Sequence, residues 1–216
     1  MNRWRIVALA LVVPAALAAQ QPHRVRLQLF GVRSTNQEVD STRNATGQGG
    51  GGSIELSYGR FSVEASGYQA SLTPDDTALV DYKLKQGDIR VYFRVLNPDQ
   101  VSGVDLAVML GGGGRTMDPA LAATEVGTIR FGVRARAPLT RLAELAVRGA
   151  YLAPKFSGGG TSKFAFEVGL DLGIGTSNGR FRFQAGFDFQ RIDRSVGGLD
   201  VPIQFTTSRG GFQLAL

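Results

Sequence analysis

The sequence predicts an all-β fold: an antiparallel, up-and-down barrel of ten strands. Beyond residue 23, apolar and polar residues alternate with a period of two, which is the side-chain period of a strand and not the 3.6-residue period of a helix. Ten such segments follow one another, and short and long connections alternate between them. Eight strands is the alternative, if the first or last pair is misassigned.

Each predicted strand rests on its own apolar face. The longest face is 164–174, where six apolar residues alternate with alanine, glycine and acids. The last strand is the weakest, because Thr206, Thr207 and Ser208 interrupt the apolar face and Gly210-Gly211 suggests a bulge. In chain order, the apolar faces lie at 25–29, 54–58, 61–67, 89–95, 104–110, 129–135, 145–151, 164–174, 181–189 and 212–216.

The connections indicate how the strands pair. Asn178-Gly179 is the strongest short hairpin signal in the chain. The short connections are 59–60, 97–100, 138–141 and 176–179, and the long ones are 34–49, 73–80, 112–124, 154–162 and 193–202. Because the two classes alternate strictly, neighbouring strands should pair as antiparallel hairpins, with the tight turns at one end of the sheet.

The composition excludes several classes of protein. The chain of 216 residues has no cysteine and one histidine, His23, so disulfide scaffolds, thiolate zinc sites and most histidine-based catalytic sites are excluded. Glu167 and Asp171 could in principle do acid–base work, but pairing with nearby arginine is the stronger expectation. The polar face also lacks the interleaved aromatic and basic residues of a nucleic-acid channel. We therefore predict no enzyme, no cofactor, no metal and no nucleic-acid partner.

The N-terminal segment is predicted to be a cleavable signal peptide, residues 1–19. A short basic start with Arg3 and Arg5 precedes an apolar run over 6–17, and small residues at 16–19 offer a cleavage site. The apolar run is too short for a comfortable membrane span. Residues 20–216 should form one exported domain.

The apolar faces are predicted to point toward lipid. The strands are roughly 10–13 residues long, and a tilted strand needs about 9–11 residues to cross a bilayer. The apolar faces contain no charged residue. The opposite faces mix small residues with acids and arginine, while lysine supplies only four of the 24 basic residues. Arginine suits partly buried ion pairs better than lysine does, so the polar faces should line the lumen of a transmembrane β-barrel.

The predicted lumen contains nearly matched acids and bases. An unpaired charge there would cost several kcal/mol, so we expect a lumen cross-linked by ion pairs; an arginine-lined polar conduit is the alternative. The expected network comprises Glu55, Glu64, Arg90, Arg94, Arg130, Arg134, Arg148, Glu167, Asp171, Arg182 and Asp188. Further lumen positions are Asp88, Asp105, Arg136, Glu144 and Arg180.

These features together resemble the small outer-membrane β-barrel proteins of bacteria. The resemblance covers residues 24–216 and rests on the signal peptide, the alternating strands, the asymmetric connections and the last strand. It implies residence in the outer membrane, contact with its lipids, both termini on the periplasmic side, and insertion by the barrel assembly machinery with periplasmic chaperones. Phe212, Leu214 and Leu216 would form the C-terminal assembly signal, although Leu216 stands where the family usually has an aromatic residue.

The expected function is a non-enzymatic membrane protein that stabilises the envelope or presents loops 34–49 and 112–124 to a partner. One alternative is a narrow passive channel for small solutes. Another is a soluble periplasmic lipocalin-like carrier, with the apolar faces turned inward around a hydrophobic ligand.

Two further sequence features bear on the loops. The glycine runs 49–52 and 111–114 lack the lysine and hydroxyl of a phosphate-binding loop, so each should be a loop base or a bend in a strand. Four basic residues, Lys83, Lys85, Arg191 and Arg194, are expected near the outer boundary, where they could meet anionic lipid headgroups.

Overall fold

The structure, a computed structural model, describes residues 24–38, 44–96, 103–119, 125–157, 159–176 and 180–216. The predicted signal peptide, His23, the connection 97–100 and the hairpin Asn178-Gly179 lie outside the described residues. In the described part, no helix is long and apolar enough to cross a membrane. The strands are β1 (Arg24–Glu38), β2 (Asn44–Tyr58), β3 (Phe61–Pro74), β4 (Tyr82–Leu96), β5 (Asp105–Asp118), β6 (Val126–Pro138), β7 (Ala143–Phe156), β8 (Thr161–Gly175), β9 (Phe181–Val196), β10 (Leu199–Asp200) and β11 (Ile203–Ala215).

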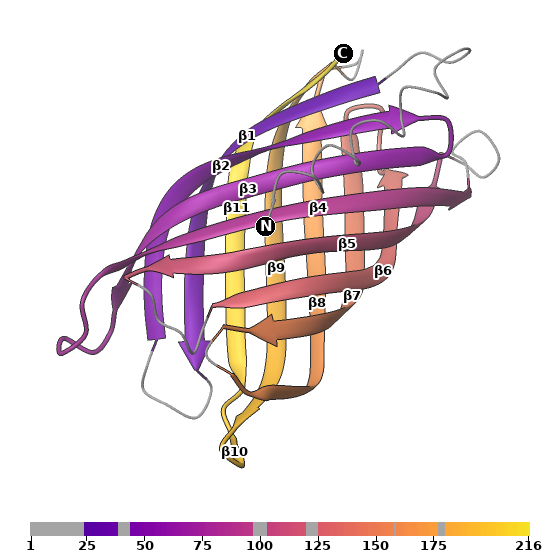
Figure 1. The fold of residues 1–216 in the computed structure, drawn as a ribbon. Coiled ribbons are helices and arrows are strands. Elements are labelled where there is room, and N and C mark those ends of the chain that lie inside the picture. Colours follow the sequence, from indigo (N-terminus) through magenta and orange to yellow (C-terminus); the bar gives the residue numbers. More distant parts are fainter. Residues whose placement is uncertain (1–23, 39–43, 97–102, 120–124, 158, 177–179) are drawn as a thin grey trace, which may run out of the picture.

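The long strands close into one antiparallel barrel. Strands β1 to β9 pair in sequence order, and β11 pairs with both β9 and β1. The two-residue β10 pairs only with the end of β9, so the barrel wall has ten strands. The prediction of ten strands is therefore confirmed, and the alternative of eight strands is wrong. Figure 1 shows β3 to β7 crossing in front of β8, β9 and β11, while β1 and β2 curve from one wall into the other.

The last strand is regular, and the predicted bulge at Gly210-Gly211 is wrong. β11 pairs with β1 without a register shift, and Gly210 lies opposite Gly31. The two register irregularities are instead at Arg94/Leu96 and Ser162/Phe164. Glycine opposite glycine fits a regular ladder, so the small residues of β11 do not require an inserted residue.

In the half of the barrel nearer the tight turns, apolar side chains face outward. Leu29 is 74% exposed and Phe131 is 65% exposed, whereas Glu55 and Arg130 face inward and are almost fully buried. This is the reverse of a soluble domain and the arrangement that a lipid-facing exterior requires. The predicted transmembrane β-barrel fold is therefore confirmed, and the lumen is polar in this half of the barrel.

At the opposite end the strands are longer than predicted. β1 runs to Glu38 and β2 begins at Asn44, so most of the predicted loop 34–49 is strand; likewise β5 continues to Asp118 through much of the predicted loop 112–124. These two loop predictions are wrong because the alternation continues with its sign reversed. Lys83 and Lys85 point outward and are exposed, while Tyr82 and Leu84 point inward and are buried.

The reversed alternation creates an apolar core inside the outer end of the barrel, which we call the apolar plug. Its members come from all ten wall strands and pack against one another, as in a soluble protein. Leu72, Leu84, Leu152 and Ile192 have no solvent exposure. The plug comprises Phe30, Val32, Ala45, Ala70, Leu72, Tyr82, Leu84, Met117, Val126, Leu152, Phe156, Ala165, Ile192, Ile203 and Phe205.

Both glycine runs lie within strands and are not loop bases. In β2, a β-carbon at Gly47, Gly49 or Gly51 would collide with the backbone of β3, so these glycines permit the close approach of the two strands where β2 curves. In β5, a β-carbon at Gly113 would collide with the Asp88 carboxylate. The second run therefore leaves room for charged side chains in the lumen.

Candidate functional site in the barrel lumen

A first group of ion pairs lies near the tight-turn end of the lumen. Glu55 of β2 accepts hydrogen bonds from Arg134 and Arg136 of β6 at 3.1 and 2.7 Å. The Arg26 guanidinium lies 3.9 Å from Glu55 and 3.7 Å from Glu144. Glu144 in turn accepts a 2.6 Å hydrogen bond from Arg182. These contacts join five strands across the lumen.

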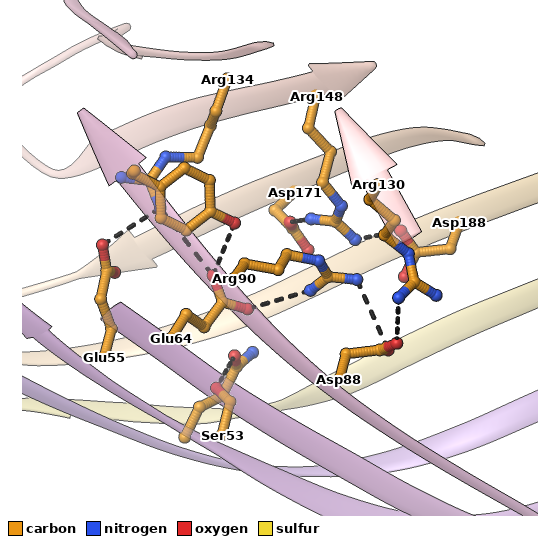
Figure 2. Close-up of polar contacts among 12 residues, drawn as sticks. Ser53, Glu55, Glu64, Asp88, Arg90, Arg130, Arg134, Arg148, Asp171 and Asp188 are labelled. Carbon is orange, nitrogen blue, oxygen red and sulfur yellow. Dashed lines mark hydrogen bonds and ion pairs between the residues drawn. The ribbon is translucent and has the colours of Figure 1, made fainter. Parts of the chain in front are cut away.

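Glu167 of β8 is the centre of the second group. Its carboxylate lies 3.4 Å from Arg90, 3.0 Å from Arg130 and 3.6 Å from Arg148. Asp88 contacts the same Arg90 and Arg130, at 3.6 and 2.5 Å. Figure 2 shows the labelled partners Asp88, Arg90 and Arg130 approaching one another from different strands. Glu167 is 5% exposed, so the pairs are shielded from solvent and should be stronger than surface pairs.

A closed set of four charges lies beside Glu167. Arg148 donates to Asp171 at 2.7 Å and also pairs with Asp188. Arg209 of β11 lies 2.8 Å from Asp171 and 3.1 Å from Asp188. Each charge therefore contacts two of opposite sign, an arrangement that offsets the desolvation of all four.

Glu64 connects the first group with the second. It lies 3.2 Å from Arg90 and 3.8 Å from Arg134, and it accepts a 2.9 Å hydrogen bond from the Tyr92 hydroxyl. The Arg134 guanidinium stacks 3.6 Å above the centre of the Tyr92 ring. Glu55, Glu64, Glu167 and their arginines thus form one continuous set of contacts, which we call the lumen network.

The structure places every predicted network residue except Arg94 in this continuous set. Arg94 pairs with Asp105 at 3.1 Å and donates to the Gly59 carbonyl, apart from the others. Arg180 is exposed in the turn before β9 and does not line the lumen as predicted, since it precedes the strand. Sequence reasoning missed Arg26, Arg115 and Arg209 as lumen residues, although all three have the inward parity of their strands.

Arg115 separates the lumen network from the apolar plug. It donates to the Gln86 and Gln190 side chains at 2.6 and 3.1 Å, and its guanidinium lies 3.4 Å above the Phe205 ring. Among the described residues, no carboxylate lies within ion-pair distance of Arg115. Its charge is thus held by amide dipoles and an aromatic face in place of an acid.

Of the four basic residues expected at the outer boundary, one differs from that expectation and three point outward. Arg194 points inward, is 3% exposed and lies 4.7 Å above the Phe156 ring; it belongs to the lumen because its position has the inward parity of β9. Arg191 points outward but pairs with Asp193 at 2.8 Å. Lys83 and Lys85 are exposed on the outer face.

The cavities that the described residues form in the lumen are small. One of about 50 Å³ lies among the first group near Arg26 and Glu144, and one of about 30 Å³ lies between Arg115 and Arg209. Each has room for a few water molecules and for no larger solute.

The lumen carboxylates are arranged as ion-pair partners of arginine. Each carboxylate of the lumen network contacts at least one arginine. Within the described ranges, no three His, Cys, Asp or Glu side chains gather closely enough to hold a metal ion.

A closed antiparallel barrel with an apolar exterior and a charged, filled interior is the fold of outer-membrane β-barrel proteins. No family model and no curated protein matches the sequence. Among solved structures, the chain is similar to the outer membrane protease OmpT from Escherichia coli, with a TM-score of 0.50 and 10% identity over 90% of this chain and 96% of that one.

Two further solved structures are similar in the same way. For an outer membrane channel from Pseudomonas putida F1 the TM-score is 0.48, with 10% identity over 94% of this chain and 99% of that one. For Neisserial surface protein A the TM-score is 0.44, with 8% identity over 90% of this chain and 99% of that one. At such identities any likeness concerns the fold alone, and at that level the match to the OmpT barrel confirms the resemblance to outer-membrane barrels.

Proposed function

We propose that the protein is a non-enzymatic, integral outer-membrane protein whose barrel is closed to solutes and whose role in the envelope is structural. The observation that carries the proposal is the double filling of the lumen. The lumen network crosses the half nearer the tight turns, and the apolar plug fills the other end. A solute that crossed the barrel would have to displace both the lumen network and the apolar plug.

Each filling resists displacement for a different physical reason. Moving Arg90 or Arg148 aside would take one arginine partner from each of three carboxylates, and breaking buried ion pairs in this way is costly. Moving Leu84 or Ile192 aside would open a cavity in close-packed apolar side chains. The narrow-channel alternative therefore requires a rearrangement that neither group favours.

The other predicted alternatives gain no support from the site. A carrier of hydrophobic ligands needs an apolar cavity, whereas the cavities here are small and lined largely by polar and charged side chains. For catalysis, Glu167 and Asp171 are both held by Arg148. This arrangement supports a non-enzymatic function.

A surface-interaction role is better assigned to strand ends than to loops 34–49 and 112–124. Outward polar residues cover the outer ends of the strands, while the apolar plug stiffens them from inside. We call these residues the polar collar: Arg33, Thr35, Gln48, Gln69, Ser71, Lys83, Lys85, Thr116, Asp118, Lys155, Arg191 and Asp193. A partner would meet a rigid surface and not a flexible loop.

The C-terminal residues are suitably placed for the assembly role that the resemblance implies. Phe212, Leu214 and Leu216 point outward from β11 and its end, and all are more than 40% exposed. An insertion machinery would meet this apolar edge before β11 pairs with β1. The C-terminal assembly signal and the cleavable signal peptide remain predictions.

Membrane location is tested by fractionating cells that express the full chain and running unboiled and boiled samples on a gel. We expect the band in the outer-membrane fraction, with a shift on boiling. A soluble periplasmic protein without a heat shift would overturn the proposal.

Closure of the lumen is tested by conductance in planar bilayers. We expect the wild-type chain to give no steady current above the bare membrane. Arg134→Ala serves as the comparison, because it removes a side chain that crosses the lumen without touching the outer surface. Steady wild-type conductance that changes with Arg134→Ala would favour the channel.

A further inference from the structure

The outward apolar belt differs in height around the barrel. On β8, six successive outward positions from Phe164 to Ile174 carry large apolar side chains. On β9, apolar residues continue from Phe181 to Phe189 before Arg191 follows. Strands β6 and β7 continue the same tall wall, with Ile129 and Tyr151 exposed toward its outer side.

On the opposite face the belt is short. β1 has three outward apolar residues, the last being Leu29, and then Gly31 and Arg33. β11 shows the same order from Leu216 to Phe212, followed by Gly210 and Ser208. β2 and β3 likewise have three outward apolar positions, which are followed by two glycines on β2 and one on β3, and then by glutamine.

The glycines at the upper edge of this face are not required by packing inside the barrel. Gly210, Gly31 and Gly50 lie side by side in register across β11, β1 and β2. A β-carbon at Gly210 would meet nothing, and at Gly31 or Gly50 it would meet no atom closer than 3.6 Å. All three point outward, so a side chain there would simply enlarge the outer surface.

Strand geometry converts these positions into heights. At about 3.3 Å per residue and a tilt near 45°, the interval from Phe164 to Ile174 spans roughly 23 Å of the bilayer normal. The interval from Val25 to Leu29 spans roughly 9 Å, and still only about 14 Å if Gly31 is counted. The usual apolar band of such barrels is about 25 Å tall. The β8 wall therefore matches a bilayer, and the β1 face falls well short of one.

We infer that the face formed by β11, β1, β2 and β3 contacts a bilayer that is locally thinned, while the face formed by β6 to β9 contacts one of ordinary thickness. The inference rests on the proposed membrane location. An unthinned bilayer would bury Arg33 and Gln69 in hydrocarbon, which is costly for polar side chains. Thinning of the lipid next to a short apolar surface is the ordinary response to such a mismatch.

The test compares folding in thin and thick bilayers for variants that lengthen the belt. The full chain is folded into vesicles of dilauroyl or dioleoyl phosphatidylcholine, and its folding equilibrium constant is measured by urea titration. The variant Gly31→Leu/Gly210→Leu raises the belt on the short face. The control Gly149→Leu/Ala185→Leu adds leucines to the tall wall, where both positions are outward and within the belt.

We expect Gly31→Leu/Gly210→Leu to raise the ratio of the thick-bilayer constant to the thin-bilayer constant by roughly three- to eightfold, from the insertion free energy of two leucines. The control should leave the ratio unchanged, because its leucines contact hydrocarbon in both bilayers. An unchanged ratio in the Gly31→Leu/Gly210→Leu variant would overturn the inference.

Two other outcomes would also overturn the inference, each for a different reason. If the wild-type chain self-associates in vesicles and the two leucines abolish that association, a second copy covers the short face and thinning is the wrong explanation. If the wild-type chain folds in neither kind of vesicle, the proposed membrane location fails, and the inference with it.

Discussion

Replacement of Glu167 by glutamine tests whether the lumen network stabilises the barrel. Glu167→Gln keeps the size and shape of the side chain and removes its charge. Three arginines, Arg90, Arg130 and Arg148, contact this one carboxylate. They would lose their shared acceptor while remaining buried.

The expected loss of stability depends on which acidic partners each arginine retains. Removing one partner of a buried ion pair usually costs about 3–5 kcal/mol. Here Arg90 and Arg130 keep Asp88, and Arg148 keeps Asp171. The loss should therefore fall at the lower end, about 3 kcal/mol in the free energy of unfolding.

The assay is reversible urea unfolding of the protein in lipid vesicles, followed by circular dichroism and by the heat-shifted gel band. The matched control is Asp200→Asn, which removes an acid whose partner Lys163 is 70% exposed. Solvent screening makes that pair worth about 1 kcal/mol or less. If both variants unfolded at the same urea concentration, the lumen charges would be solvated and the network would contribute nothing particular to stability.

Three other substitutions test separate features. Gly49→Ala should destabilise the barrel by about 1–3 kcal/mol because its β-carbon collides with the β3 backbone, whereas Gly50→Ala, on the open face, should change stability by less than about 0.5 kcal/mol; equal urea midpoints would refute the assigned faces. Leu84→Ala in the apolar plug should cost about 2–5 kcal/mol, and a near-neutral result would mean that the plug is not packed. Arg130→Met should cost more than Arg115→Met, because only the first leaves carboxylates short of a partner; the reverse order in urea would contradict the electrostatic assignment.

The barrel could be predicted from sequence because alternation reports directly on which face a strand buries. The segment 164–174 alternates without interruption, and its strand appears as β8 with the predicted outward face. The pairing order followed from the strict alternation of short and long connections between neighbouring strands. Local pattern was sufficient for both.

The outer ends of the strands could not be assigned in this way because the surroundings of the barrel wall change there from lipid to water. Lys83, Leu84 and Lys85 alternate as regularly as any lipid-facing segment, but with polar residues outward. A search for apolar outward faces treats such segments as loops. Arg115 was missed for this reason, because it lies in the predicted loop 112–124. The specific pairs in the lumen depend on residues from opposite walls, such as Arg90 and Glu167, and no local pattern contains that information.

The pairing of β1 with β11 also constrains the order of events during biogenesis. Residues 24–38 have no partner on one side until residues 203–215 have been synthesised and delivered. Up to that moment the sheet has two free edges whose unpaired amides could recruit other chains. Contacts so distant in sequence form slowly, so closure should be a late, concerted event. A chain ending before β11 should yield an open, aggregation-prone sheet in place of a smaller barrel.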